Sequence, residues 1–157
     1  MSLASYAQLL DTFGRSIGLA GAAPDADGYC AMSFDDLVVH LQYDDDTVTI
    51  FSRLGEVDED RTEGIYAMLL AANLFWQGAK GATLSVEPDS RLAFIADRRP
   101  VAQLSDAGFR DWLGGFVTIA DYWQKRLAAA NAGGALWEED GDGASPAGPD
   151  PTTMTRV

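Results

Sequence analysis

The sequence predicts an α+β fold, a twisted and mainly antiparallel sheet of about five strands with three helices in the order α-β-β-β-α-β-β-α. Apolar residues recur at helical spacing near both ends of the chain, and two pairs of β-rich runs are separated by short polar turns. Between the two pairs lies a third helical segment that is apolar on two sides. Because one small core cannot easily cover both sides, the pattern predicts a homodimer.

Composition limits the chain to one domain and excludes several kinds of partner. Its 157 residues are 47% hydrophobic, which is enough for one core. The 24 acidic against 11 basic residues give a net charge of −13, which would repel nucleic acid and anionic membranes. No run of 18 apolar residues is present, and the amino terminus lacks the basic residues of a secretory signal. We therefore expect a cytoplasmic protein that binds no nucleic acid and inserts into no membrane.

The first segment is expected to form an amphipathic helix over residues 2–17. Its apolar side chains recur three and four residues apart, at Leu3, Tyr6, Leu10, Phe13 and Ile17. Gly18 and Gly21 suit the end of this helix, and residues 21–28 have the composition of a loop. A short strand over Tyr29–Phe34 should follow.

Residues 37–43 and 47–54 are two β-rich runs separated by three aspartates, a spacing that predicts a hairpin. If Asp45 and Asp46 form the turn, the cross-strand pairs follow by counting. The pairs on the core face are Tyr43 with Val48, Leu41 with Ile50, Val39 with Ser52, and Leu37 with Leu54. Those on the other face are Val38 with Arg53, His40 with Phe51, and Gln42 with Thr49. The second face is neither fully polar nor fully apolar, so it is a candidate surface for a partner.

The central helix is expected to run from Ile65 to about Trp76, with a glycine-marked exit at Gly78 and Gly81. One apolar face would contain Ile65, Leu69, Ala72 and Trp76, flanked by Met68 and Phe75. A second stripe would contain Tyr66, Leu70 and Leu74. Small alanines beside the second stripe would allow a second copy of the chain to approach closely.

The following residues predict a second hairpin and a long helix. Thr83–Val86 and residues 91–96 are the strands, joined by a turn at residues 88–90, and Pro100 should interrupt the pairing. Ser105 is a good N-cap for a helix that runs to about Ala130. Its helical spacing is kept by Phe109, Trp112, Leu113, Phe116, Ile119, Ala120, Trp123 and Leu127. These aromatic residues can line a ligand pocket or pack the core, and the spacing favours the core.

The character of the chain changes at Asn131, so we expect a folded domain over residues 1–131. Residues 132–157 contain five acidic residues, three prolines and few apolar groups. Such a composition buries too little surface to fold, which predicts a disordered acidic tail that is dispensable for folding.

The residue types needed for catalysis or metal binding are scarce. His40 is the only histidine, which excludes a two-histidine metal site. A thiolate pair of Cys30 with His40 is one alternative, and a buried inert thiol is the other. The acidic residues 44–46 lack the alternating ligands of a calcium loop, and no second ligand cluster follows the acidic run at residues 138–143. We therefore expect no catalytic residue, no metal, no cofactor and no enzymatic activity.

Two runs of residues resemble a known family: NLFWQGAKGATL at residues 73–84 and RLAF at residues 91–94. With the predicted order of elements, they are similar to the class I type III secretion chaperones of the Tir chaperone family, over about residues 3–128. The resemblance implies a cytoplasmic, ATP-independent homodimer that binds the amino-terminal segment of an effector in extended form and keeps it secretion-competent. An alternative is a non-secretory protein-binding adaptor or regulator on the same fold.

The resemblance also implies which residues make contacts. In the family the central helix is the main dimer element, so the expected interface is Tyr66, Leu70, Asn73 and Leu74. Apolar patches on the first helix and the sheet contact the effector, so the expected effector-binding residues are Leu3, Tyr6, Leu10, Val38, His40 and Phe51. The net acidity of the domain favours an effector segment with basic residues between its apolar anchors.

Overall fold

The structure, a computed structural model, describes residues 2–137. Its elements are α1 (Leu3–Ser16), β1 (Tyr29–Phe34), β2 (Leu37–Asp44), β3 (Thr47–Glu56), η1 (Glu59–Arg61), α2 (Thr62–Ala72), η2 (Leu74–Trp76), β4 (Thr83–Val86), β5 (Leu92–Pro100), η3 (Val101–Gln103) and α3 (Asp106–Asn131). The five strands form one antiparallel sheet in the order β1-β2-β3-β5-β4. The predicted α+β fold class and order of elements are confirmed.

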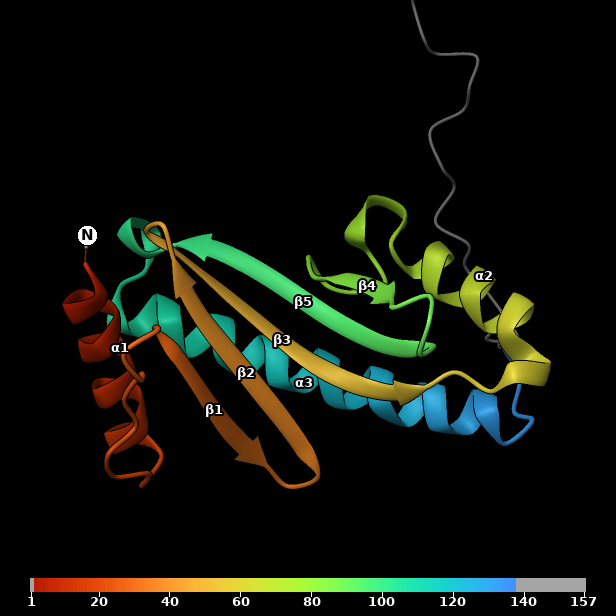
Figure 1. Cartoon of the computed structure of the whole chain (residues 1–157), viewed down its shortest axis with the longest axis horizontal. Helices are drawn as coiled ribbons and strands as arrows, with labels where there is room; N and C mark the ends of the chain where they lie inside the picture. Colours follow the sequence, from red (N-terminus) through yellow and green to blue (C-terminus); the bar gives the residue numbers. More distant parts are fainter. Residues whose placement is uncertain (1, 138–157) are drawn as a thin grey trace, which may run out of the picture.

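The helices occupy one face and the two ends of the sheet (Figure 1). The long α3 runs behind the strands, α1 packs beside the start of α3, and α2 lies at the far end next to β4. None of the helices among residues 2–137 is both long enough and apolar enough to cross a membrane.

The central hairpin has the register that its sequence predicts. His40 pairs with Phe51, Leu41 with Ile50, Gln42 with Thr49, and Tyr43 with Val48. Asp45 and Asp46 have φ angles of 44° and 57°, the left-handed pair that a two-residue hairpin turn requires. Alternate side chains of each strand therefore point toward the helices or away from them.

The core lies between the inner sheet face and the helices. Its largest fully buried side chains are Tyr6, Phe109, Leu10, Leu37, Leu41, Ile50, Ile65, Ile95, Leu113, Leu127, Val39 and Val48. The Ser105 hydroxyl accepts a hydrogen bond from the Gly108 N–H at 3.0 Å, so it caps α3 as expected. The α3 aromatics Trp112, Phe116 and Trp123 are buried in the same core.

Two element boundaries differ from the expectation. The strand β5 continues to Pro100, which pairs with Thr47 at the last position of the ladder, where a missing N–H costs least. The helix α2 ends at Ala72, and the backbone then turns left-handed at Phe75 and Trp76, with φ angles of 51° and 55°. The expectation that Trp76 lies on the core side was wrong, because both aromatic side chains are exposed.

Asn73 is the C-cap of α2 and ties the end of this helix to β4. Its side-chain amide donates to the Leu84 carbonyl at 2.8 Å and accepts from the Leu84 N–H at 2.9 Å. Asn73 itself keeps right-handed helical φ and ψ angles of −75° and −13°, and the backbone leaves the helix at Phe75. Downstream, the Trp123 indole donates to the Gly78 carbonyl at 3.0 Å and holds the loop against α3.

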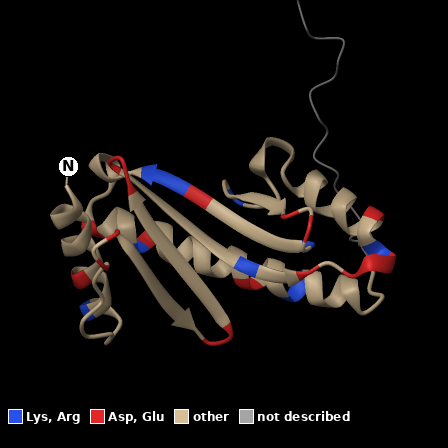
Figure 2. Ribbon diagram, in the orientation of Figure 1, with Lys and Arg blue, Asp and Glu red and all other residues tan. Residues whose placement is uncertain are grey.

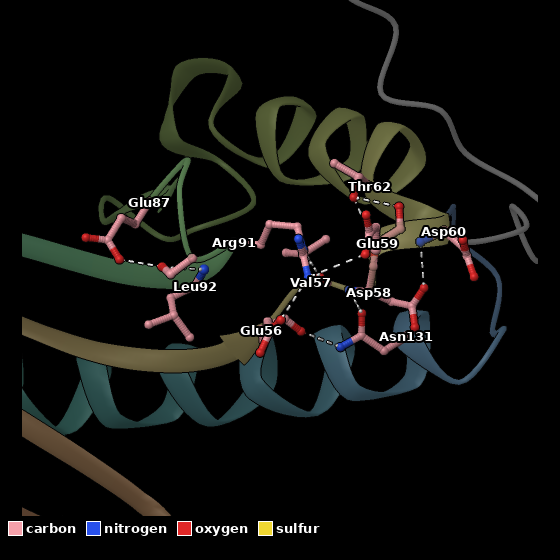
Figure 3. Close-up of polar contacts among 11 residues, drawn as sticks. Glu56, Val57, Asp58, Glu59, Asp60, Thr62, Glu87, Arg91, Leu92 and Asn131 are labelled. Carbon is pink, nitrogen blue, oxygen red and sulfur yellow. Dashed lines mark hydrogen bonds and ion pairs between the residues drawn. The ribbon is translucent and has the colours of Figure 1, made fainter.

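The end of α3 is tied to the β3–α2 turn by polar contacts (Figure 3). The Asn131 side chain accepts from the Asp58 N–H at 2.9 Å and donates to the Glu56 carbonyl at 2.8 Å. On the other side of the turn, the Arg91 guanidinium donates to the Val57 carbonyl and to the Glu56 carboxylate. The turn that leads into α2 is therefore fixed from both sides.

Packed structure continues past Asn131, where composition predicts the domain to end. Arg61 donates to the Gly134 carbonyl at 3.1 Å, and Arg126 donates to the Leu136 carbonyl at 2.9 Å. Leu136 packs against the core beside Gly64, where a Cβ atom would collide with it. Residues 132–136 are therefore docked on α2, while the predicted acidic tail from residue 138 onward lies outside the described residues.

Candidate functional site

The sheet face turned away from α1 and α3, here called the outer sheet face, carries a row of aromatic side chains. His40 stacks on Phe51 with ring centroids 4.9 Å apart and on Tyr29 at 6.0 Å. The Tyr29 hydroxyl lies 2.7 Å from His40 Nδ1, at hydrogen-bond distance. Val38 beside this row is 41% exposed, and His40 and Phe51 are half-buried. Val38, His40 and Phe51, all predicted to contact an effector, thus lie together on an accessible apolar surface.

The three residues predicted on the first helix are placed differently. Tyr6 and Leu10 have no exposed surface, and Leu3 is half-buried against the core. Tyr6 stacks on Tyr43, with ring centroids 5.6 Å apart. The apolar stripe of α1 is therefore used by the fold itself, and of the predicted first-helix contacts only Leu3 reaches the surface.

The free edge of β1 borders a surface hollow formed with the α1–β1 loop. The lining residues are Leu19, Ala20, Gly21, Ala22, Ala23, Pro24, Asp25, Tyr29, Cys30, Ala31 and Met32. The N–H and C=O of Tyr29 both bond to Asp25, on the side away from β2. Because hydrogen-bonding direction alternates along an antiparallel strand, the backbone groups of Ala31 and Ser33 point to the same open side. A strand of another chain could pair there.

A second accessible apolar surface, here called the α2 apolar surface, consists of Leu70, Leu74, Phe75 and Trp76. Their exposed fractions are 71%, 63%, 75% and 58%. Leu70 and Leu74 were predicted as interface residues, whereas Phe75 and Trp76 were assigned to the core side. Tyr66, also predicted at the interface, is half-buried against the core. Asn73, the fourth residue predicted at the interface, is half-buried, and its amide bonds the backbone of Leu84.

The backbone at Phe75 and Trp76 holds two bulky side chains in a conformation that costs about 1 kcal/mol or more per residue. The contacts of Asn73 and Gly78 described above, and a bond from the Gly81 N–H to the Trp76 carbonyl at 3.0 Å, maintain it. An aromatic pair held in solvent by a strained, well-fixed loop is typical of an association surface.

The described residues do not assemble a reactive centre at the positions considered. Cys30 pairs with Leu41 in the register, one position from His40, so the two side chains lie on opposite faces of the sheet. Burial raises the pKa of the Cys30 thiol, with a further contribution from Asp25, which disfavours the thiolate. Within residues 2–137, no three histidine, cysteine or acidic side chains gather in a way that could hold a metal ion.

A family model for the Tir chaperone protein (CesT) family matches residues 8–124. The chain belongs to this family. The match confirms the resemblance noted in the sequence, and it includes both the outer sheet face and α2. Members of this family are chaperones, which are not enzymes. A comparison with curated protein sequences finds no significant match.

Solved structures share the fold at low sequence identity. The HopA1–SchA chaperone–effector complex contains a chain with 23% identity and a TM-score of 0.63, over 80% of this chain and 97% of that one. The ExsC–ExsE complex gives 22% identity and a TM-score of 0.67, with coverage of 80% and 95%. The Yersinia pestis type III secretion chaperone SycH, in complex with a fragment of YscM2, gives 22% identity and a TM-score of 0.58. The match covers 75% of this chain and 98% of that one.

Proposed function

We propose that the protein is a cytoplasmic, ATP-independent type III secretion chaperone that binds the amino-terminal segment of an effector in extended form and keeps it secretion-competent. Membership of the Tir chaperone family supports the proposal, as do fold neighbours that were solved as chaperone–effector complexes. The observation that carries it is the outer sheet face, where Val38, His40 and Phe51 form an accessible apolar surface with no helix over it (Figure 1).

The two edges of the sheet support an extended mode of binding. At β4 the amide of Asn73 already occupies the N–H and C=O of Leu84. At β1 the backbone groups of Ala31 and Ser33 point away from β2, and Ala31 lines the hollow. An incoming segment can add a strand at β1, with main-chain bonds for affinity and side chains in the hollow for specificity.

We further propose that two copies associate through the α2 apolar surface. Four large apolar side chains between Leu70 and Trp76 are each more than half exposed. A patch of this kind is unfavourable in a soluble monomer and typical of a protein interface. A twofold interface is self-complementary, so a single helix and its following loop suffice to form it.

The functional test is calorimetry of the full chain against about the first 100 residues of a secreted effector, since a segment that orders on binding gives a large heat-capacity change. Phe51→Glu should weaken binding at least about tenfold, because it places a charge in an apolar contact. Thr118→Glu, which adds the same charge on the exposed side of α3, is the matched control and should bind normally.

Unaltered affinity of Phe51→Glu would remove the outer sheet face from the site. Binding only to proteins that are not exported would favour the adaptor or regulator instead. Turnover of a small substrate that is lost on changing His40 or Cys30 would overturn the chaperone assignment.

A further inference from the structure

The charges of this acidic protein are distributed unevenly, and the outer sheet face carries cations. Strand alternation places Arg53 of β3 and Arg98 of β5 on this face, and both are exposed. The carboxylates at outer-face positions of the strands are restricted to strand ends, Asp44 in β2 and Glu56 in β3. Figure 2 shows blue segments on β3 and β5, red at the turns, and a red segment beside the blue one on β5. The acidic residue of β5 is Asp97, which pairs with the buried Ile50 and so lies at an inner-face position.

Arg53 and Arg98 are also available for a ligand. Glu56 is already paired with Arg91 at 3.0 Å. Within residues 2–137, no carboxylate forms an ion pair with Arg53 or Arg98. Two unpaired guanidinium groups therefore flank the apolar row of Tyr29, His40 and Phe51.

The spacing of the two arginines matches an extended chain. Arg98 lies opposite Thr49, and Arg53 is four residues further along β3. At a rise of about 3.3 Å per residue, they are separated by about 13 Å along the strand and by one strand spacing of about 4.8 Å across it. Phe51 lies midway between them on the same face.

We propose that the occupant of the outer sheet face is an extended segment that carries two carboxylates four residues apart, with an apolar side chain midway. Side chains i, i+2 and i+4 of an extended chain point to one side, so the carboxylates can meet Arg98 and Arg53 while the apolar residue covers Phe51. The inference rests on the proposed function, and it names the chemistry of the segment bound there.

Direct contacts with Arg53 and Arg98 determine the preferred charge of the bound segment more strongly than the net charge of the whole protein does. At physiological ionic strength the screening length is about 8 Å, so the net charge of the whole protein acts only weakly at a direct contact. A guanidinium in direct contact with a carboxylate forms paired, directional hydrogen bonds. The net acidity of the sequence predicts basic residues between the apolar anchors of the effector segment. The placement of Arg53 and Arg98 instead favours acidic residues in that segment.

The test uses the full chain and three synthetic peptides of equal length, with the central patterns Asp-Thr-Phe-Thr-Asp, Asn-Thr-Phe-Thr-Asn and Lys-Thr-Phe-Thr-Lys. Binding is followed by NMR shifts of the backbone amides of β2 and β3, which detect weak complexes. The aspartate peptide should bind about tenfold more tightly than the lysine peptide, with the asparagine peptide between them, and added salt should remove the preference.

The charge-reversed chain R53E/R98E should invert the order of the aspartate and lysine peptides. The matched control R15E/R110E changes the net charge equally on the exposed surfaces of α1 and α3, and it should keep the original order. Equal binding of all three peptides, or an order unchanged in R53E/R98E, would overturn the inference and leave the proposed function standing. Absence of shifts on β2 and β3 with every peptide would count against this face as a binding site altogether.

Discussion

At the scale of single residues, Asn73 has the largest structural effect for its size. Its side-chain amide has an N–H donor and a C=O acceptor that point to the same side, so it can bond the N–H and the C=O of a single strand residue. By bonding both backbone groups of Leu84, it acts for β4 as a neighbouring strand would. The same contact fixes the end of α2, just before the loop that exposes Phe75 and Trp76.

Replacing Asn73 by alanine should lower the free energy of unfolding by about 2 to 3 kcal/mol, because two hydrogen bonds are lost and Leu84 keeps unpaired backbone groups. Urea unfolding followed by tryptophan fluorescence measures the change. Gln77→Ala, on an exposed neighbour, is the control and should change stability by less than about 0.5 kcal/mol. A loss that small for Asn73→Ala would show that the amide does not hold the loop.

Tyr6 predicts a specific response to alkaline pH. Its hydroxyl is buried without a hydrogen-bond partner in the described structure, and burial raises its pKa well above the ordinary value, with smaller contributions from Cys30 and Asp25. Above pH of about 10 the unfolded chain releases this proton while the native chain retains it, so stability falls as pH rises. Tyr6→Phe should therefore be as stable as the parent at pH 7 and more stable by about 1 kcal/mol at pH 11. If the stability of the two proteins had the same dependence on pH, a raised pKa of Tyr6 would be contradicted.

At the scale of elements, the sequence correctly predicted the features that depend on interactions between residues close together in the chain. Apolar spacing gave the extent of α1 and α3, and the turn aspartates gave the register of β2 with β3. The end of α2 could not be predicted in this way, because the apolar spacing continues to Trp76 while the backbone turns left-handed at Phe75.

The predictions of accessible apolar residues were also correct where local alternation decides, and wrong where tertiary packing decides. The predicted outer face of the hairpin was correct, since strand alternation alone decides it. Whether the stripe of α1 remains free depends on the packing of α1 against the sheet and α3, which spacing does not reveal. Residues 132–136 were missed because composition averages over a window, while the docking of Leu136 needs only one apolar side chain and a glycine opposite it.

The docked segment after α3 gives an element-scale prediction. Truncation after Trp137 should leave the melting temperature nearly unchanged. Truncation after Asn131 should lower the free energy of unfolding by about 1 to 3 kcal/mol, because the Leu136 contact and the hydrogen bonds from Arg61 and Arg126 are lost. Thermal unfolding by circular dichroism measures both. As matched point variants, Leu136→Ala should destabilise and Trp137→Ala, 56% exposed, should not. Equal stability of the two truncated chains would contradict a structural role for residues 132–136.

At the scale of the whole molecule, the two candidate surfaces are separated. The α2 apolar surface lies beyond β4, at the opposite edge of the sheet from β1 (Figure 1). Association through α2 would therefore leave the β1 edge and the outer sheet face of each copy free for a partner.

Leu70→Asp should convert the dimer to a folded monomer, because the side chain is 71% exposed in the single chain and would become an unpaired ion in the interface. Light scattering at micromolar concentration gives the mass, and circular dichroism checks the fold. The monomer should retain its affinity for an effector segment within about threefold, since the binding surfaces lie elsewhere. A monomeric parent protein would contradict the dimer, and a monomer without affinity would show that the two surfaces are coupled.

The Asn73 amide on β4 also affects how copies of the protein can associate through their sheets. A sheet with two open edges can be extended from both sides, so that β1 of one molecule pairs with β4 of the next and an open-ended fibre grows. Here the backbone groups of Leu84 that such a neighbour would need are already bonded, which disfavours pairing at β4. An incoming strand therefore finds unbonded partner groups at β1, and a head-to-tail fibre of this protein is disfavoured.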